Sequence, residues 1–190
     1  MKNQILLRNQ LSSIGKVLFQ DIIKMTPARI LFACCVLLLV LRVSAQEVRE
    51  LNNVLLENNV ETIQIRSLVN DLQPALYYQQ GVLINSNVET PLLIDIDAVS
   101  LNQLYANNPQ FSSVQIIRIR INNPEDLSRN LDISRLSFFP NLKYVYFLCT
   151  FEICEEQASK SACEIGKISK LIISGDSSKI KFFYLISIPS

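Results

Sequence analysis

The chain of 190 residues is 49% hydrophobic and 18% charged, and it contains four glycines, five cysteines and no histidine. This length fits one ordinary domain, or one domain with a targeting segment, and the apolar content is too high for a disordered chain. The lack of histidine excludes a Ser-His-Asp triad, a histidine-ligated metal and a histidine pH switch, and the scattered glycines form no phosphate-binding loop. We therefore expect no metal and no cofactor.

Residues 1–45 are predicted to be a signal peptide. Twelve consecutive apolar residues, Ile30 to Leu41, follow the basic residue Arg29, and the small residue Ala45 closes the segment. This arrangement is typical of a secretory signal that is cleaved after Ala45. A membrane anchor is the alternative, but twelve helical residues rise only about 18 Å, against about 30 Å of hydrocarbon. Translation from Met25 would give a signal of conventional length.

Removal of this segment changes the charge balance of the chain. Twelve of the 18 basic residues and sixteen of the 17 acidic residues remain, so the formal net charge becomes −4. An acidic chain without basic runs argues against nucleic acid as a partner and against binding to a membrane surface. We expect an exported protein without a membrane span, secreted or periplasmic. The absence of any Asn-x-Ser/Thr sequon favours a bacterial envelope.

Three cysteines, Cys149, Cys154 and Cys163, follow the predicted cleavage site. In an oxidising compartment, three cysteines favour one disulfide and one remaining thiol. A zinc site would lack a fourth ligand, and a catalytic thiol would lack an imidazole base. We predict a disulfide between Cys154 and Cys163 across a short polar helix, with Cys149 buried in a strand.

Residues 46–90 are predicted to form an N-terminal helical or capping segment. The apolar spacing predicts a helix over Gln46–Asn59. Residues 62–66 alternate like a strand, whereas the apolar residues that follow them continue a helical stripe, and both interpretations stay open. Leu76 to Ile84 is either a pair of strands that turns at Gly81 or one irregular segment.

From residue 91 onward, one strand-like pattern occurs four times. Its copies begin at Pro91, Val114, Leu142 and Ile180, with offsets of 23, 28 and 38 residues. Helix-compatible stretches separate the copies: Leu101–Ala106, Leu127–Leu136 and Glu155–Ile172. The last strand ends near the end of the chain, so it lies inside the sheet order, is covered by a partner, or belongs to a truncated reading frame.

The best copy, Val114–Asn122, matches the pattern L-x-x-L-x-L-x-x-N, and Phe139-Pro140-Asn141-Leu142-Lys143 is a typical lead-in. In these motifs residues 91–190 resemble a leucine-rich repeat protein. The resemblance implies an α/β fold, a short solenoid with parallel strands and helices on one side. The alternative is a small α/β domain in which parallel strands and crossover helices also alternate.

The repeat offsets predict neighbouring parallel strands at 92–97, 116–121, 143–149 and 181–187. In this register Asp95 lies beside Arg118, and Asp97 lies beside Arg120. Two aspartates on one strand face could bind a divalent cation, but no third ligand is visible. We therefore favour cross-strand ion pairs. The residues expected on the other face, pointing toward the helices, are Ile94, Ile96, Ile117, Ile119, Val145, Phe147, Phe183 and Leu185.

Aromatic residues continue the charged face in the same register. Adding the repeat offsets to Arg118 gives Tyr146 and then Tyr184, and adding the same first offset to Ile116 gives Tyr144. Arginine and aromatic side chains are enriched at binding hot spots. The predicted binding residues are therefore Arg118, Arg120, Tyr144, Tyr146 and Tyr184. Alternatively, helices or the N-terminal segment cover this face and make the aromatic residues part of the core.

The function expected from these features is that of an exported, non-catalytic interaction module that binds a protein or a glycan through its strand face. One alternative is an exported α/β hydrolase that uses carboxylates such as Asp95 and Asp97, because carboxylate pairs alone can perform acid–base chemistry. Another is a structural envelope protein without a ligand of its own. The oligomeric state stays open.

Overall fold

The computed structural model describes residues 47–155, 159–173 and 179–188. Contacts divide the chain into two units, Met1–Ala45 and Gln46–Ser190. The predicted signal peptide, its cleavage site and the alternative start at Met25 lie outside the described residues. Within the described ranges, no helix is both long enough and apolar enough to cross a bilayer.

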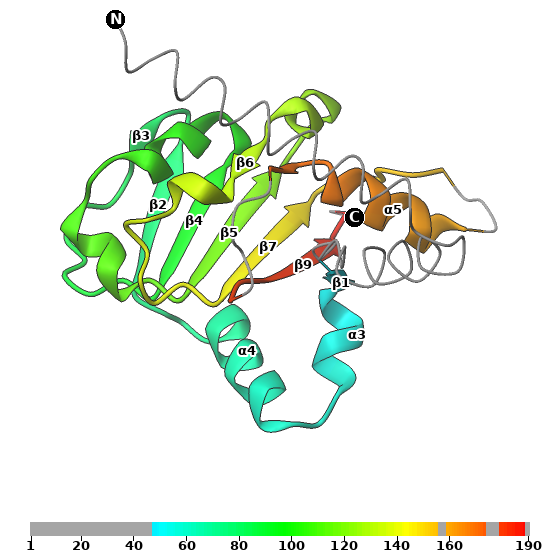
Figure 1. The fold of residues 1–190 in the computed structure, drawn as a ribbon, viewed down its shortest axis with the longest axis horizontal. Helices are drawn as coiled ribbons and strands as arrows, with labels where there is room; N and C mark the ends of the chain where they lie inside the picture. Colours follow the sequence, from blue (N-terminus) through cyan, green and yellow to red (C-terminus); the bar gives the residue numbers. More distant parts are fainter. Residues whose placement is uncertain (1–46, 156–158, 174–178, 189–190) are drawn as a thin grey trace, which may run out of the picture. The chain divides into compact units, whose positions relative to one another are not determined.

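A seven-stranded sheet forms the centre of the second unit, with the strand order β1-β9-β7-β5-β4-β2-β3 (Figure 1). Neighbouring strands are parallel, except that β2 and β3 are antiparallel. The protein is therefore an α/β domain with a mostly parallel sheet. Its strands are β1 (Val48–Glu50), β2 (Ala75–Gln79), β3 (Val82–Leu83), β4 (Leu93–Asp97), β5 (Ile116–Ile121), β7 (Tyr144–Cys149) and β9 (Lys181–Ile186).

A tight turn joins β2 and β3. Its two residues, Gln80 and Gly81, have φ angles of 50° and 80°. Two left-handed residues suit a two-residue hairpin, because their backbone twist matches the twist of the flanking strands. Of the two interpretations for Leu76 to Ile84, the strand pair is confirmed.

The helical segments are short and are mostly capped by Asn or Asp side chains. Asn59, for example, accepts a hydrogen bond from the Thr62 amide at 2.8 Å and so begins α4. The α-helices are α3 (Leu51–Leu56), α4 (Val60–Asn70) and α5 (Lys160–Ser169), and the 3-10 segments are η1 (Ala98–Tyr105), η2 (Pro109–Ser113), η3 (Pro124–Ser128) and η4 (Ile133–Arg135). A second small sheet pairs β6 (Leu131–Asp132) with β8 (Ile172–Ile173).

The N-terminal segment 46–90 contributes strands to the main sheet as well as helices. The predicted helix Gln46–Asn59 is only partly correct, because Val48–Glu50 form β1 and pair with β9 before α3 begins. A three-residue strand is stabilised by a distant partner, which local spacing does not reveal. Residues 62–66 belong to α4, so the helical interpretation of this stretch is confirmed.

The two faces of the sheet contact different helices. The inner face packs against the 3-10 segments and α5, and its buried strand residues are Val48, Leu76, Tyr78, Ile94, Ile96, Ile117, Ile119, Ile121, Val145, Phe147, Cys149, Phe182 and Tyr184. The outer face packs against α3 and α4, and its buried apolar strand residues are Ala75, Leu93, Ile116, Tyr144, Tyr146 and Phe183. The expectation that helices lie on one side only is therefore wrong. A small α/β domain describes this arrangement, and a leucine-rich-repeat solenoid is not shown.

The predicted register is confirmed for β4, β5 and β7. Asp95 is paired with Arg118, Asp97 with Arg120, and Arg118 with Tyr146. Strand β9 follows β7 in the sheet as predicted, and it lies inside the sheet order because β1 covers its other edge.

The predicted register of β9 itself is wrong by one residue. Tyr146 is paired with Phe183, not with Tyr184. Phe183 and Leu185 consequently lie on the outer face, and Phe182 and Tyr184 lie on the inner face. The four residues 182–185 are all apolar or aromatic, so their pattern does not indicate which of them point to which face.

Candidate functional site

Helices α3 and α4 cover only part of the outer face. Their buried side chains pack near the first residues of the strands, such as Leu93, Ile116 and Tyr144. Farther along the strands the outer face is partly exposed. We call this region the open half of the outer face, and it comprises Arg118, Arg120, Leu148 and Leu185.

A buried aspartate holds both arginines of the open half. Asp95 is 3% exposed and forms an ion pair with Nη2 of Arg118. Its other oxygen lies 2.9 Å from Nε of Arg120, within ion-pair distance but without hydrogen-bond geometry. Two guanidinium groups thus share one carboxylate, which leaves a formal charge of +1 on this cluster.

Further contacts hold the two guanidinium groups in place. Arg118 Nη1 donates to the Tyr146 hydroxyl at 3.3 Å, and Arg120 Nη2 donates to the Tyr78 carbonyl at 3.1 Å. Burial opposes the charged form of Arg118, but its hydrogen bonds to Asp95 and Tyr146 and the negative charge of Asp95 outweigh this effect and raise its pKa. Arg118 therefore stays charged, with 24% of its side chain exposed, and Arg120 has 27% exposed.

Three of the five predicted binding residues are not on an exposed surface. Tyr144 and Tyr146 are 3% and 2% exposed, because α3 and α4 pack on this part of the face. Tyr184 lies on the opposite face and is 1% exposed. The alternative that these aromatic residues belong to the core is therefore confirmed. Arg118 and Arg120 alone of the five have solvent-accessible side chains on the outer face.

The second aspartate of the predicted pair has a structural role. Asp97 ends β4 and caps η1: its carboxylate accepts hydrogen bonds from the amides of Ser100 at 3.0 Å and Gln80 at 2.8 Å. It therefore does not form an ion pair with its register partner Arg120, which contacts Asp95 instead. Within the described ranges, no group of three potential ligands is arranged to hold a metal ion.

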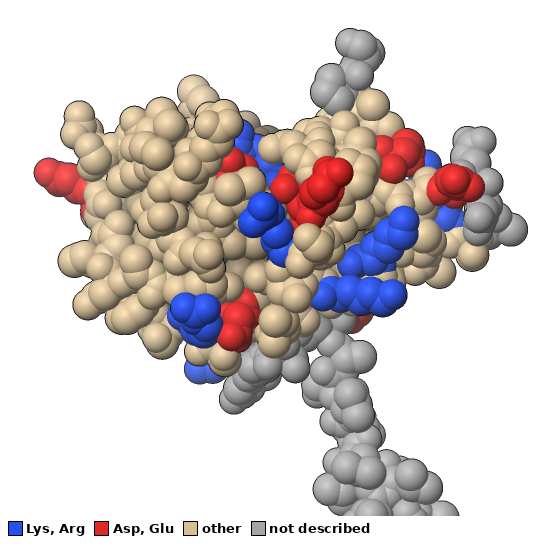
Figure 2. Space-filling model, turned by 90° about the horizontal axis from the view of Figure 1, so that it is seen from above, with Lys and Arg blue, Asp and Glu red and all other residues tan. Residues whose placement is uncertain are grey.

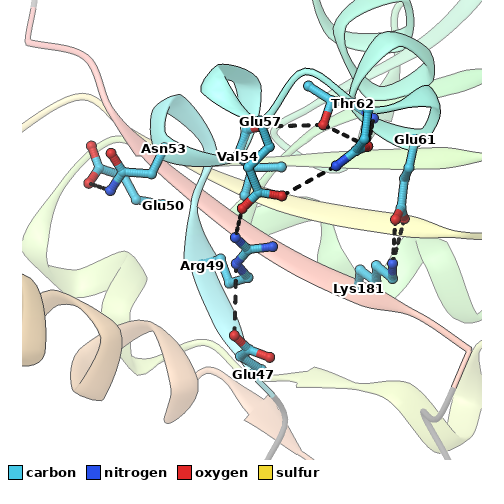
Figure 3. Close-up of polar contacts among 10 residues, drawn as sticks. Glu47, Arg49, Glu50, Asn53, Val54, Glu57, Glu61, Thr62 and Lys181 are labelled. Atoms are coloured by element: carbon cyan, nitrogen blue, oxygen red, sulfur yellow. Dashed lines mark hydrogen bonds and ion pairs between the residues drawn. The ribbon is translucent and has the colours of Figure 1, made fainter.

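Polar contacts fasten the helical cover to the sheet (Figure 3). Arg49 of β1 lies between the carboxylates of Glu47 and Glu57. Lys181, at the start of β9, lies 2.6 Å from both carboxylate oxygens of Glu61 in α4. The helix pair is thus tied to the edge strand and to its neighbour.

A pocket of about 490 Å³ lies at the carboxyl ends of β1 and β9, beside α5. Ligands of open α/β sheets commonly bind at the carboxyl ends of the strands. Its lining residues are Glu50, Glu152, Lys160, Ser161, Glu164, Tyr184, Ile186 and Ile188. Sequence patterns do not reveal this pocket, because Glu50 and Glu164 are far apart in the chain and form no local motif. Seen from above, charged side chains gather toward the side of the molecule where α5 lies (Figure 2).

The predicted disulfide between Cys154 and Cys163 is present and links the segment after β7 to α5. Cys149 is a free, buried cysteine at the end of β7, also as predicted. Burial, together with the charge of Glu164, raises the pKa of its thiol to about 12, so the reactive thiolate is scarce near neutral pH. A disulfide is compatible with an exported protein.

Comparisons of the chain with protein-family models, with curated proteins and with solved structures find no match. The resemblance to leucine-rich repeat proteins therefore stays a prediction.

Proposed function

We propose that the protein is an exported, non-catalytic interaction module that binds a protein or a glycan through the open half of the outer face. The observation that carries this proposal is the pair of partly exposed arginines held by Asp95. Their contacts with Tyr146 and the Tyr78 carbonyl restrict both side chains before any ligand arrives. Preorganised side chains lose less conformational entropy on binding.

The composition of the open half suits a ligand with an anionic group. The guanidinium groups carry the excess positive charge, and planar guanidinium groups recognise carboxylates well. Leu148 is paired with Arg120 and with Leu185 across the sheet, so apolar side chains flank the charge. We therefore propose an acidic peptide segment or an acidic glycan as the ligand class.

The repeat-like sequence pattern fits this proposal. Strands β4, β5 and β7 pair residue for residue in the predicted register, as they would in a leucine-rich-repeat-like array or in another parallel α/β sheet. Strands β1 to β3 and the outer helices would be additions to that array. The hydrolase alternative relied on Asp95 and Asp97, and both carboxylates are engaged in ion pairs or helix capping.

The test measures binding of the purified protein to an array of acidic glycans, neutral glycans and acidic peptides. Binding to an acidic probe should fall at least about tenfold in the variant Arg120→Gln, because the probe loses a charged hot-spot contact. Arg129→Gln is the matched control. It removes the same charge from Arg129, an exposed residue that ends η3 and forms an ion pair with Asp126. The proposal fails if acidic probes bind no better than neutral ones, or if both variants lose affinity equally.

A further inference from the structure

The pocket at the carboxyl ends of β1 and β9 brings together side chains from three elements. Glu50 ends β1 and is the register partner of Tyr184 in β9. The Tyr184 hydroxyl donates to Oε2 of Glu164 in α5 at 3.1 Å. The pocket therefore combines a sheet edge and a helix, and it is separate from the open half of the outer face.

Glu164 is a buried carboxylate with no basic partner among the residues that the structure describes. It is 6% exposed and lines the pocket. Among the described residues, its hydrogen bond comes from the neutral hydroxyl of Tyr184, and no ion pair includes it. Lys160 lies 2.8 Å from a different carboxylate, that of Glu152. A buried carboxylate is costly unless a cation or several hydrogen bonds compensate it, so Glu164 favours a positive group in the pocket.

The remaining walls define what kind of cation would fit. Three glutamates and one lysine give the lining a formal net charge of −2. Ile186 and Ile188 add apolar surface, which a hydrated metal ion would not use. The volume lies within the range of small-molecule sites. An ammonium or guanidinium group on an apolar stem matches both the charge and the apolar walls.

We infer that this pocket binds an organic cation, namely a primary ammonium or guanidinium group on an apolar stem, supplied by a free amine or by a basic side chain of a peptide. Glu164 contacts the cation, Glu50 adds negative charge at the end of β1, and Ile186 and Ile188 contact the stem. Tyr184 is a positioning residue, because its hydroxyl donates to Glu164. Burial raises the pKa of Tyr184 to about 12, so this donor keeps its proton at neutral pH.

Calorimetric titration with n-pentylamine and n-pentanol tests the charge requirement, because the two probes share one stem. Pentylamine should bind at least about tenfold more tightly than pentanol, because only pentylamine forms an ion pair with Glu164. Glu164→Gln should remove this preference and leave pentanol binding unchanged. Glu89→Gln, which removes the same charge from an exposed loop residue, should bind both probes as the wild type does.

A second variant keeps the test valid if Glu164→Gln fails to fold. Glu50→Gln changes a partly exposed residue at the pocket and should weaken pentylamine binding in the same direction. The tripeptide Gly-Lys-Gly and its counterpart Gly-Gln-Gly separate the sources: tighter binding of Gly-Lys-Gly than of pentylamine indicates a peptide side chain, and the reverse order indicates a free amine. The inference is overturned if pentylamine does not bind, binds no better than pentanol, or binds to both glutamate variants as tightly as to the wild type. These outcomes leave the arginine cluster untested, so the two proposals fail independently.

Discussion

The two faces of the sheet differ in how completely they are covered. On the inner face, the residues of β4, β5 and β7 are apolar and pack against the 3-10 segments and α5. On the outer face, α3 and α4 bury the first part of each strand, and a charged cluster occupies the part beyond. The inner face contributes to stability, whereas the outer face contributes to stability and also carries the partly exposed arginines for which we propose a binding role.

Strand β5 shows this difference within six residues. Ile117, Ile119 and Ile121 lie on the inner face, and each is at most 1% exposed. Arg118 and Arg120 alternate with them and lie on the outer face. A strand of period two can therefore supply both the core and the proposed binding residues. Substitutions in β5 consequently measure the contribution of each face to the free energy of unfolding separately.

The largest effect is expected from Ile119→Ala on the inner face. This change opens a cavity among fully buried side chains, so the free energy of unfolding should fall by about 2–5 kcal/mol. Arg118→Ala, one residue away, should cost about 1 kcal/mol or less, because Asp95 keeps its contact with Arg120. Chemical denaturation of both variants measures the difference, with the exposed Ile84→Ala as the control. Equal losses at positions 118 and 119 would contradict the assignment of the two faces.

The disulfide should give the next largest effect, because it ties α5 onto the inner face. Replacing Cys154 and Cys163 together by Ser should lower the free energy of unfolding by up to about 3 kcal/mol, according to the loop-entropy account. The wild-type protein under reducing conditions is the matched comparison and should be equally destabilised. Thiol counting in denaturant without reductant should find one free cysteine in the chain after Ala45. Three free thiols would disprove the disulfide, and none would indicate a bridge between molecules.

On the outer face, Asp95→Asn should cost about 1–3 kcal/mol, because two adjacent guanidinium groups lose their shared carboxylate. The cost stays below that of breaking a fully buried pair, since both arginines reach water. Asp71→Asn, at the exposed end of α4, is the control. The double variant Asp95→Asn/Arg118→Gln should be less destabilised than the sum of the single variants. Strict additivity would show that the cluster is not coupled.

Sequence patterns predicted the parts of the fold where apolar and charged residues alternate. In β4 and β5, isoleucines alternate with Asp95, Arg118 and Arg120, so the pattern identified the face and the register. In β9, apolar residues run without interruption, and the register was wrong by one residue. The three cysteines that follow the predicted signal segment favoured one disulfide, and the placement of Cys149 in a strand left Cys154 and Cys163 as the pair.

The missed features depend on contacts between distant segments. The pairing of β1 with β9 joins the beginning of the described chain to its end. The packing of α3 and α4 on the outer face buried Tyr144 and Tyr146, which sequence patterns alone left as possible surface residues. The pocket around Glu164 likewise requires β1, β9 and α5 together. Local periodicity contains no information about such long-range assembly.

The free energy of unfolding should depend on two buried groups, Cys149 and Tyr184, at alkaline pH but not near neutrality. Burial raises the pKa of Cys149 from 9.0 to about 12 and that of Tyr184 from 10.0 to about 12. The unfolded chain therefore releases these protons first as the pH rises, so stability is retained below about pH 9 and lost between about pH 9 and 12. Denaturation at a series of pH values should show this loss. In the variant Cys149→Ala/Tyr184→Phe the decline should be shallower than in the wild type, because two of the inner-face groups that titrate in this range are gone. Parallel declines would show that other groups cause the loss.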